Sequence, residues 1–97
     1  MKFIYNKNSI QCRDENTDLL LGEVNFENVS EGLLEVTHTY VSPSCRGQGI
    51  GDQLMHAMVD YLAECHLRTY LSCSYAVKWF YQHPEYQHRV QDFNCCS

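Results

Sequence analysis

The first part of the chain alternates apolar and polar residues, with the period of two that is typical of half-buried β-strands. Two short alternating segments, at residues 3–5 and 10–12, flank a polar run at residues 6–9 that has the composition of a turn. This arrangement predicts a hairpin. After a second polar turn at residues 14–18, residues 20–26 alternate again, which predicts a third strand with one apolar face.

Residues 33–41 carry bulky side chains at both even and odd positions, as expected of a central strand that is covered on both faces. Simple alternation places His38 and Tyr40 on the same face as Leu34 and Val36. It places Glu35 on the opposite face.

From residue 52 the apolar period becomes helical and predicts a helix of about four turns. Residues 67–73 then alternate as a further strand, and residues 76–82 fit a short helix before Pro84. Strands followed by helix, strand and helix indicate the α+β class. We expect a single domain over residues 1–97, with a mixed, mainly antiparallel sheet, one long helix and a short C-terminal helix.

Charge and composition narrow the possible partners. The formal net charge is -5, with only seven Lys and Arg in 97 residues. Broad binding to nucleic acid or to an anionic membrane needs clustered cations, so we expect neither. No segment approaches the roughly 20 apolar residues of a membrane span. The start of the chain lacks the apolar core of a secretory signal, which favours a cytoplasmic location.

The six cysteines have no regular spacing, and we interpret them as mainly reduced thiols. A zinc site is an alternative, because His83 and His88 have a spacing that zinc fingers use and Cys95 and Cys96 follow. No C-x-x-C pair accompanies these residues. The sequence therefore predicts no metal.

The chain's most informative segment is Arg46-Gly47-Gln48-Gly49-Ile50-Gly51, which lies between a predicted strand and the long predicted helix. The first N–H groups of a helix are unpaired, and glycines let the backbone fold closely around an anion. Arg46 adds a permanent cation. The segment thus predicts a phosphate or pyrophosphate cradle, and the alternative is a glycine-rich turn without a ligand. It matches neither a Walker loop nor a dinucleotide-binding fingerprint.

Arg46, Gly49 and Gly51 match the pattern Arg/Gln-x-x-Gly-x-Gly/Ala, and here the sequence resembles the GNAT N-acetyltransferase superfamily. The segments at residues 38–43, His-Thr-Tyr-Val-Ser-Pro, and at residues 73–75, Cys-Ser-Tyr, extend the likeness to small single-domain GNAT-like acetyltransferases. The resemblance covers about residues 20–86 and implies a GNAT-like fold. It also implies acetyl-CoA as the cofactor.

The resemblance further implies where coenzyme A would bind. Pantetheine would lie along the end of the central strand near Tyr40 and Val41, with its thioester pointing towards Cys73. The pyrophosphate would bind the amides of the glycine loop, which makes the predicted cofactor-binding residues Tyr40, Val41, Arg46, Gly47, Gln48, Gly49, Ile50 and Gly51. Larger GNAT enzymes have two helices between their first two strands, whereas only the turn at residues 6–9 is available here, so we expect an open acceptor side.

The catalytic residues depart from the family pattern. Typical GNAT enzymes often place a Tyr seven residues after an Asn on the last core strand, but here Cys73 and Phe80 occupy those positions. Tyr75 and Tyr81 are candidate replacements for the general acid.

We predict that His38 is the base or proton relay, since imidazole exchanges protons near neutral pH. The alternative is a core histidine. Cys73 is a candidate general acid or nucleophile, and the alternative is a buried strand cysteine.

Three functions follow. The first is an acetyl-CoA-dependent N-acetyltransferase that acts on an amine, with a protein or peptide among the candidate acceptors. The second is a non-catalytic module that binds CoA or acyl-CoA. The third is a structural domain whose glycine loop holds no ligand.

Overall fold

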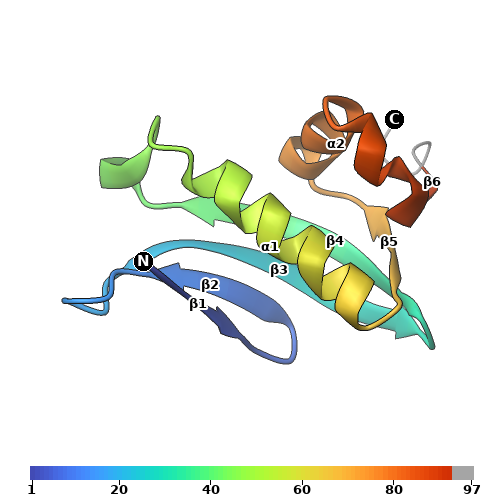
Figure 1. Ribbon diagram of the computed structural model, residues 1–97, viewed down its shortest axis with the longest axis horizontal. Helices are drawn as coiled ribbons and strands as arrows, with labels where there is room; N and C mark the ends of the chain where they lie inside the picture. Colours follow the sequence, from blue (N-terminus) through green and yellow to red (C-terminus); the bar gives the residue numbers. More distant parts are fainter. Residues whose placement is uncertain (93–97) are drawn as a thin grey trace.

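The computed structural model of the protein describes residues 1–92. Figure 1 shows a sheet with one long helix lying across it and a second helical region beside that helix. In chain order the elements are β1 (Lys2–Tyr5), β2 (Ser9–Arg13), β3 (Leu20–Ser30), β4 (Leu33–Val41), the 3-10 turn η1 (Pro43–Cys45), α1 (Ile50–Glu64), β5 (Arg68–Leu71), α2 (Ser74–Tyr81), η2 (Pro84–Arg89) and β6 (Val90–Asp92).

The six strands form one sheet in the order β1-β2-β3-β4-β5-β6. Neighbouring strands from β1 to β4 are antiparallel, while β4–β5 and β5–β6 are parallel. The predicted α+β class and the mixed, mainly antiparallel sheet are confirmed. The short strand β6 and the turn η2 were not expected, because residues 84–92 carry no clear apolar period.

Helix α1 packs along one face of the sheet and forms the core with it. Its buried stripe includes Leu54, Met55, Met58 and Leu62, each fully buried. Side chains from β2, β3 and β4 lie beneath this stripe and are buried with it: Ile10, Cys12, Val24, Phe26, Leu34 and Val36. This packing therefore fixes the position of the first turn of α1 relative to the ends of β3 and β4.

Strand β4 differs from the prediction because it contains a β-bulge. Val24 pairs with Thr39 and Phe26 pairs with Val36, so Thr37 is an extra residue in β4. A bulge shifts the side-chain alternation by one position. His38 and Tyr40 therefore do not share a face with buried Leu34 and Val36 as predicted: they are exposed, on the opposite face of the sheet.

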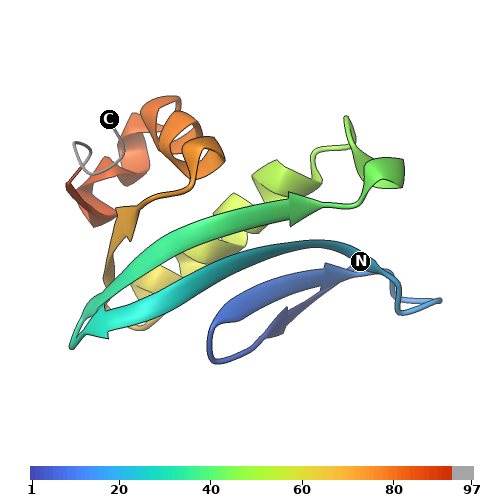
Figure 2. The same cartoon turned by 180° about the vertical axis from the view of Figure 1, so that it is seen from behind.

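Strand β4 is buried on one face only, which corrects the expectation that both faces are covered. Leu34 and Val36 alternate with partly exposed residues along the strand. In Figure 2 the front of β2, β3 and β4 is crossed by no helix of residues 1–92, and α1 lies behind the strands.

Helices α1 and α2 contact each other, since Trp79 donates a hydrogen bond to Asp52. None of the helices in residues 1–92 is long and apolar enough to cross a membrane.

Gly22 allows α1 to approach β3 closely. A Cβ atom at this position would lie 2.8 Å from Ile50 Cγ2, 2.9 Å from the Tyr40 carbonyl oxygen and 3.0 Å from Leu54 Cδ1. The carbonyl belongs to the backbone of β4 and cannot rotate away as a side chain can. The start of α1 therefore depends on a glycine in the strand beneath it.

We expect Gly22→Ala to lower the free energy of unfolding by about 1–3 kcal/mol, because the added methyl group overpacks this contact. Urea denaturation followed by circular dichroism measures the loss. The matched control is Asn28→Ala in the exposed part of the same strand, which should change the stability by less than about 0.5 kcal/mol. Equal midpoints for wild type and Gly22→Ala would contradict the close packing.

Candidate functional site

The loop between η1 and α1 is shaped by two glycines with positive φ. Gly47 has φ 83° and Gly49 has φ 78°, and Gly49 is the N-cap residue of α1. A Cβ at either position would meet nothing within 4 Å, so the backbone conformation and not a lack of space requires glycine there. Gly51 follows inside the first turn of α1.

No side chain caps the N-terminus of α1. The first N–H groups of a helix have no partner within the helix, and they carry the positive end of its dipole. Arg46 is exposed beside them and forms no salt bridge with any side chain that the structure describes in residues 1–91. The loop therefore presents unpaired donors and a free cation at one place, which are the groups that bind an anion.

A pocket of about 210 Å³ lies at this loop. It brings together six of the eight predicted cofactor-binding residues. Tyr40 and Gln48 do not line it. Three lining residues were not predicted as part of the cradle, namely Cys45, Asp52 and Tyr75. The lining residues are Val41, Cys45, Arg46, Gly47, Gly49, Ile50, Gly51, Asp52 and Tyr75.

Strands β4 and β5 separate next to this pocket. Their parallel pairing runs from Leu33 and Arg68 to Val36 and Leu71, and no residue pair continues it within the described chain. The N–H groups of Ser72 and Cys73 both donate to the Val36 carbonyl oxygen, at 3.0 and 3.3 Å. Beyond Val36 the edge of β4 therefore turns away from β5, and it can pair with an extended ligand.

Cys73 stands at this separation, between the end of β5 and the start of α2. The residue is 9% exposed, and its Sγ lies 3.4 Å from Thr39 Oγ1. The bulge at Thr37 explains the contact, because it turns Thr39 towards the helical side of the sheet. Thr39 is the residue of the site that alternation alone missed.

Tyr75 covers the start of α1. A Cβ on Gly51 would lie 2.6 Å from its hydroxyl oxygen, so the ring rests on the first turn. Partial burial of the phenol, together with the nearby charges of Asp52 and Cys73, raises the pKa of Tyr75 above its ordinary value. A phenol carries its proton at neutral pH, so the Tyr75 hydroxyl is a candidate donor. Tyr75 also lines a second pocket of about 220 Å³ with Lys78, Trp79 and Gln82.

Phe80, which occupies the position of the usual general-acid tyrosine, is fully buried in the core, while the candidate acid Tyr81 is 61% exposed on α2. Tyr75 is therefore the tyrosine that the fold brings next to Cys73 and the glycine loop. The exposure of His38 removes the alternative of a core histidine. Because of the bulge, His38 lies on the face of the sheet opposite to Thr39 and its contact with Cys73.

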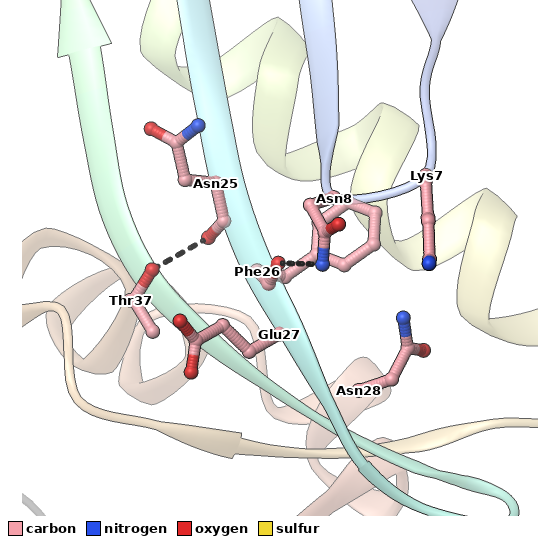
Figure 3. A pocket seen from close by; sticks show the side chains of 7 residues that line it. All are labelled: Lys7, Asn8, Asn25, Phe26, Glu27, Asn28 and Thr37. Carbon is pink, nitrogen blue, oxygen red and sulfur yellow. Dashed lines mark hydrogen bonds between the residues drawn. The ribbon is translucent and has the colours of Figure 1, made fainter.

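The open face of the sheet carries a larger, polar pocket of about 600 Å³. Figure 3 shows it between the β1–β2 turn and strands β3 and β4. Thr37, the extra residue of the bulge, lines it and donates to the Asn25 carbonyl oxygen at 3.3 Å. Glu27 also lines it and pairs directly with Glu35 on β4. Like charges placed opposite each other destabilise a sheet, and a bound cation would relieve the repulsion.

The fold and the glycine loop define a protein of the acetyltransferase class. The family model described as GCN5-related N-acetyl-transferase matches residues 9–89, and the chain belongs to this family. Protein NATD1 of Mus musculus is 32% identical over 68 residues, and the human Protein NATD1 shows the same identity. The match covers 68% of this chain and 62% of the mouse protein, so the chain spans less than two thirds of these relatives' length.

Solved structures give the same result. A GCN5-like protein from Staphylococcus aureus superposes with a TM-score of 0.73 at 27% identity, covering 92% of this chain and 86% of that one. Rv2747 from Mycobacterium tuberculosis, whose crystal structure contains CoA and NLQ, has a TM-score of 0.66 at 15% identity. That match covers 80% of this chain and 48% of Rv2747, and it supports the fold alone. The predicted resemblance to GNAT acetyltransferases is confirmed.

Proposed function

We propose that the protein is an acetyl-CoA-dependent N-acetyltransferase that transfers an acetyl group to an amine. Its family and fold indicate acetyl transfer as the class of reaction. The single observation that carries the proposal is the uncapped start of α1 beside Gly47, Gly49 and Arg46, since these groups fit a pyrophosphate. The free thiols of residues 1–92, at Cys12, Cys45, Cys65 and Cys73, agree with a cytoplasmic location.

The donor would lie along β4. Its pyrophosphate would bind the loop amides and Arg46, and Lys78, which lines the adjoining pocket, would meet a further phosphate. Pantetheine would pair with the edge of β4 beyond Val36, near Tyr40 and Val41, where β5 no longer pairs. Its thioester would then reach the separation between the strands, beside Cys73.

Two proton transfers are proposed, one to His38 and one from Cys73 or Tyr75. His38 would take a proton from the amine at a ring nitrogen, so that the nitrogen lone pair can attack the thioester carbonyl. His38 and Cys73 lie on opposite faces of the sheet, and we propose that the substrate reaches both groups where β4 separates from β5. The carbon–sulfur bond then breaks, and Cys73 or Tyr75 would give its proton to the departing thiolate.

A covalent route uses Cys73 differently. Its thiolate would attack the thioester carbonyl and release CoA, and the amine would then attack the acetylated Cys73. The thiol is regenerated at the end, so the overall reaction is the same. The free thiol at the separation of the strands is what supports this route.

The acceptor side favours a cationic substrate. The open face of the sheet presents Glu27 and Glu35 near the bulge, and an amine is protonated before it is activated. No helix of residues 1–92 covers this face, so a segment of a protein or peptide can reach it as easily as a small amine (Figure 2).

The proposal is tested by incubating the protein with acetyl-CoA and a broad panel of amines, peptides and proteins. We expect mass spectrometry to detect an acetyl group on at least one acceptor, with release of free CoA, and His38→Ala to slow the transfer. If CoA binds but no acceptor is acetylated, the protein is instead a non-catalytic CoA-binding module. Burial of Phe80 where the usual acid would stand is the observation that favours this second function.

A further inference from the structure

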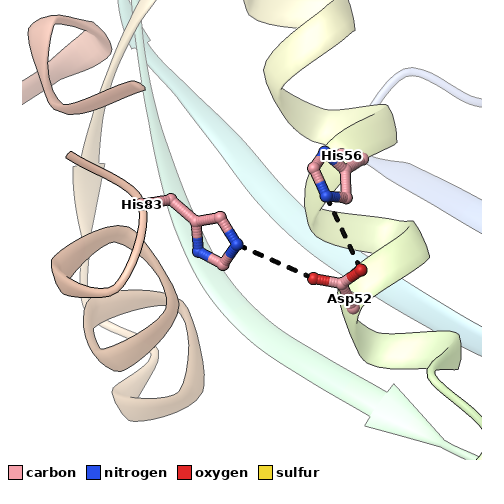
Figure 4. Close-up of side chains that lie close together, drawn as sticks. All are labelled: Asp52, His56 and His83. Carbon is pink, nitrogen blue, oxygen red and sulfur yellow. Dashed lines mark ion pairs between the residues drawn. The ribbon is translucent and has the colours of Figure 1, made fainter. Parts of the chain in front are cut away.

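Asp52, His56 and His83 place three possible metal ligands within 4.8 Å of one another. Figure 4 shows both imidazoles directed at the Asp52 carboxylate from two separate parts of the chain. Asp52 and His56 are four residues apart on α1 and so share one face of the helix. His83 is the residue that immediately precedes η2. Among the side chains that the structure describes in residues 1–91, no other group of three His, Cys, Asp or Glu is placed in this way.

Trp79 orients all three side chains. Its indole N–H donates to Asp52 Oδ1 at 2.8 Å, and its carbonyl oxygen lies 2.7 Å from His83 Nδ1. The His83 ring stacks on the indole with ring centroids 3.8 Å apart, while the His56 ring meets it edge-on at 5.1 Å. The histidines that bind metals commonly donate a hydrogen bond from the N–H of their second ring nitrogen to a carbonyl oxygen in this way. The three ligands are therefore held in place by one buried residue.

The distances between these groups fit a shared metal ion better than direct hydrogen bonds. Since the Trp79 carbonyl accepts from His83 Nδ1–H, the Nε2 atom of the neutral ring presents a lone pair towards Asp52. Nε2 lies 4.0 Å from Asp52 Oδ1, and His56 Nε2 lies 3.6 Å from Asp52 Oδ2. A charge-assisted hydrogen bond would be about 2.7–2.9 Å long. Ligands bound to one tetrahedral Zn²⁺ ion are about 3.3 Å apart, given bonds of about 2.0 Å.

We propose that Asp52, His56 and His83 bind a divalent transition-metal ion such as Zn²⁺. Two imidazoles and one carboxylate are a ligand set that zinc accepts, with a remaining position open to water or another ligand. The side chains are 51%, 45% and 24% exposed, so an ion can enter from solvent. This site departs from the sequence prediction of no metal. It uses His83, but without His88 and without Cys95 and Cys96, which lie outside the described residues.

The test is a titration of the full chain with Zn²⁺ by calorimetry, and with Ni²⁺ or Co²⁺ by fluorescence. Trp79 is the only tryptophan and contacts both imidazoles, so a paramagnetic ion at this site should quench its emission. We expect one ion per chain. His56→Gln and His83→Gln should each weaken binding at least about 100-fold, a loss no smaller than that caused by removing an outer partner of a ligand.

His88→Gln is the matched control, because His88 lies five positions after His83 in the exposed turn η2 and takes no part in the cluster. Its affinity for Zn²⁺ should equal that of the wild type. Asp52→Asn keeps an acceptor for the Trp79 N–H but removes the charge, and it should weaken binding without unfolding the chain. Circular dichroism of every variant separates lost binding from lost structure.

Three results would overturn the site: no binding of any of these ions at roughly millimolar concentration, unchanged affinity in both His56→Gln and His83→Gln, or a thiolate-to-Co²⁺ charge-transfer absorption that shows cysteine ligands. The measurement requires no CoA. The proposed metal site is therefore tested independently of the proposed acetyltransferase function.

Discussion

Replacing Gly49 with aspartate is expected to raise the Kd for CoA at least about 100-fold. The side chain would place a carboxylate beside the unpaired N–H groups of α1, where the proposed pyrophosphate binds. Two like charges about 4 Å apart near a protein surface repel by about 4 kcal/mol at an effective dielectric constant of 20. Isothermal titration calorimetry with CoA measures the effect.

Backbone strain must be separated from this electrostatic effect, and Gly32 provides the control. Gly32 has φ 76°, close to the 78° of Gly49, and a Cβ there would also meet nothing within 4 Å. Gly32 lies in the turn between β3 and β4, away from the residues that line the pocket. Gly32→Asp and Gly49→Asp should each cost about 1–2 kcal/mol of stability, since both force a left-handed conformation on a non-glycine residue.

Only Gly49→Asp should lose affinity for CoA. Equal affinity of Gly49→Asp and wild type would place the pyrophosphate elsewhere. Equal losses in Gly49→Asp and Gly32→Asp would mean that strain, and not charge at the loop, weakens binding.

Replacing Cys73 with alanine is expected to lower kcat for acetyl transfer about 100-fold or more, which is the usual contribution of a positioned proton donor or nucleophile. The residue stands where β4 and β5 separate, and its thiol contacts Thr39 Oγ1. Initial rates of CoA release with a saturating acceptor measure the change. A Cys73→Ala enzyme with wild-type kcat would exclude both chemical roles.

Intact-mass measurement after incubation with acetyl-CoA alone distinguishes the two roles. The covalent route predicts one acetyl adduct that disappears in Cys73→Ala, whereas the direct route predicts no adduct at Cys73. Cys65→Ser is the matched control, because Cys65 is an exposed thiol at the end of α1 that can react nonspecifically. An adduct that disappears in Cys65→Ser instead would argue against the covalent route.

Much of the fold follows from apolar periodicity. The strand predicted over residues 33–41 has the observed bounds of β4, and the predicted long helix agrees with α1 because its apolar stripe is continuous. The glycine loop was also predictable, because Gly47 and Gly49 take conformations that other residues avoid. These features depend on short-range chemistry, which the sequence carries directly.

The bulge in β4 was not predictable from the same pattern. Bulky residues occur at both parities of residues 33–41, so no change of alternation marks the extra residue Thr37. As a result His38 was assigned to the wrong face and Thr39 was overlooked. The cluster around Trp79 was missed for a different reason, since Asp52 and His83 are far apart in the sequence and meet only when α2 packs beside α1.

The central claim is that the glycine loop and the free edge of β4 bind CoA. Titration of the ¹⁵N-labelled protein with CoA, followed by backbone amide NMR, tests it most directly. We predict saturable shifts concentrated at residues 37–41 and 46–52 and at Tyr75, with only small changes in β1 and β2. No shifts at millimolar CoA, or shifts confined to the far strands, would contradict the claim.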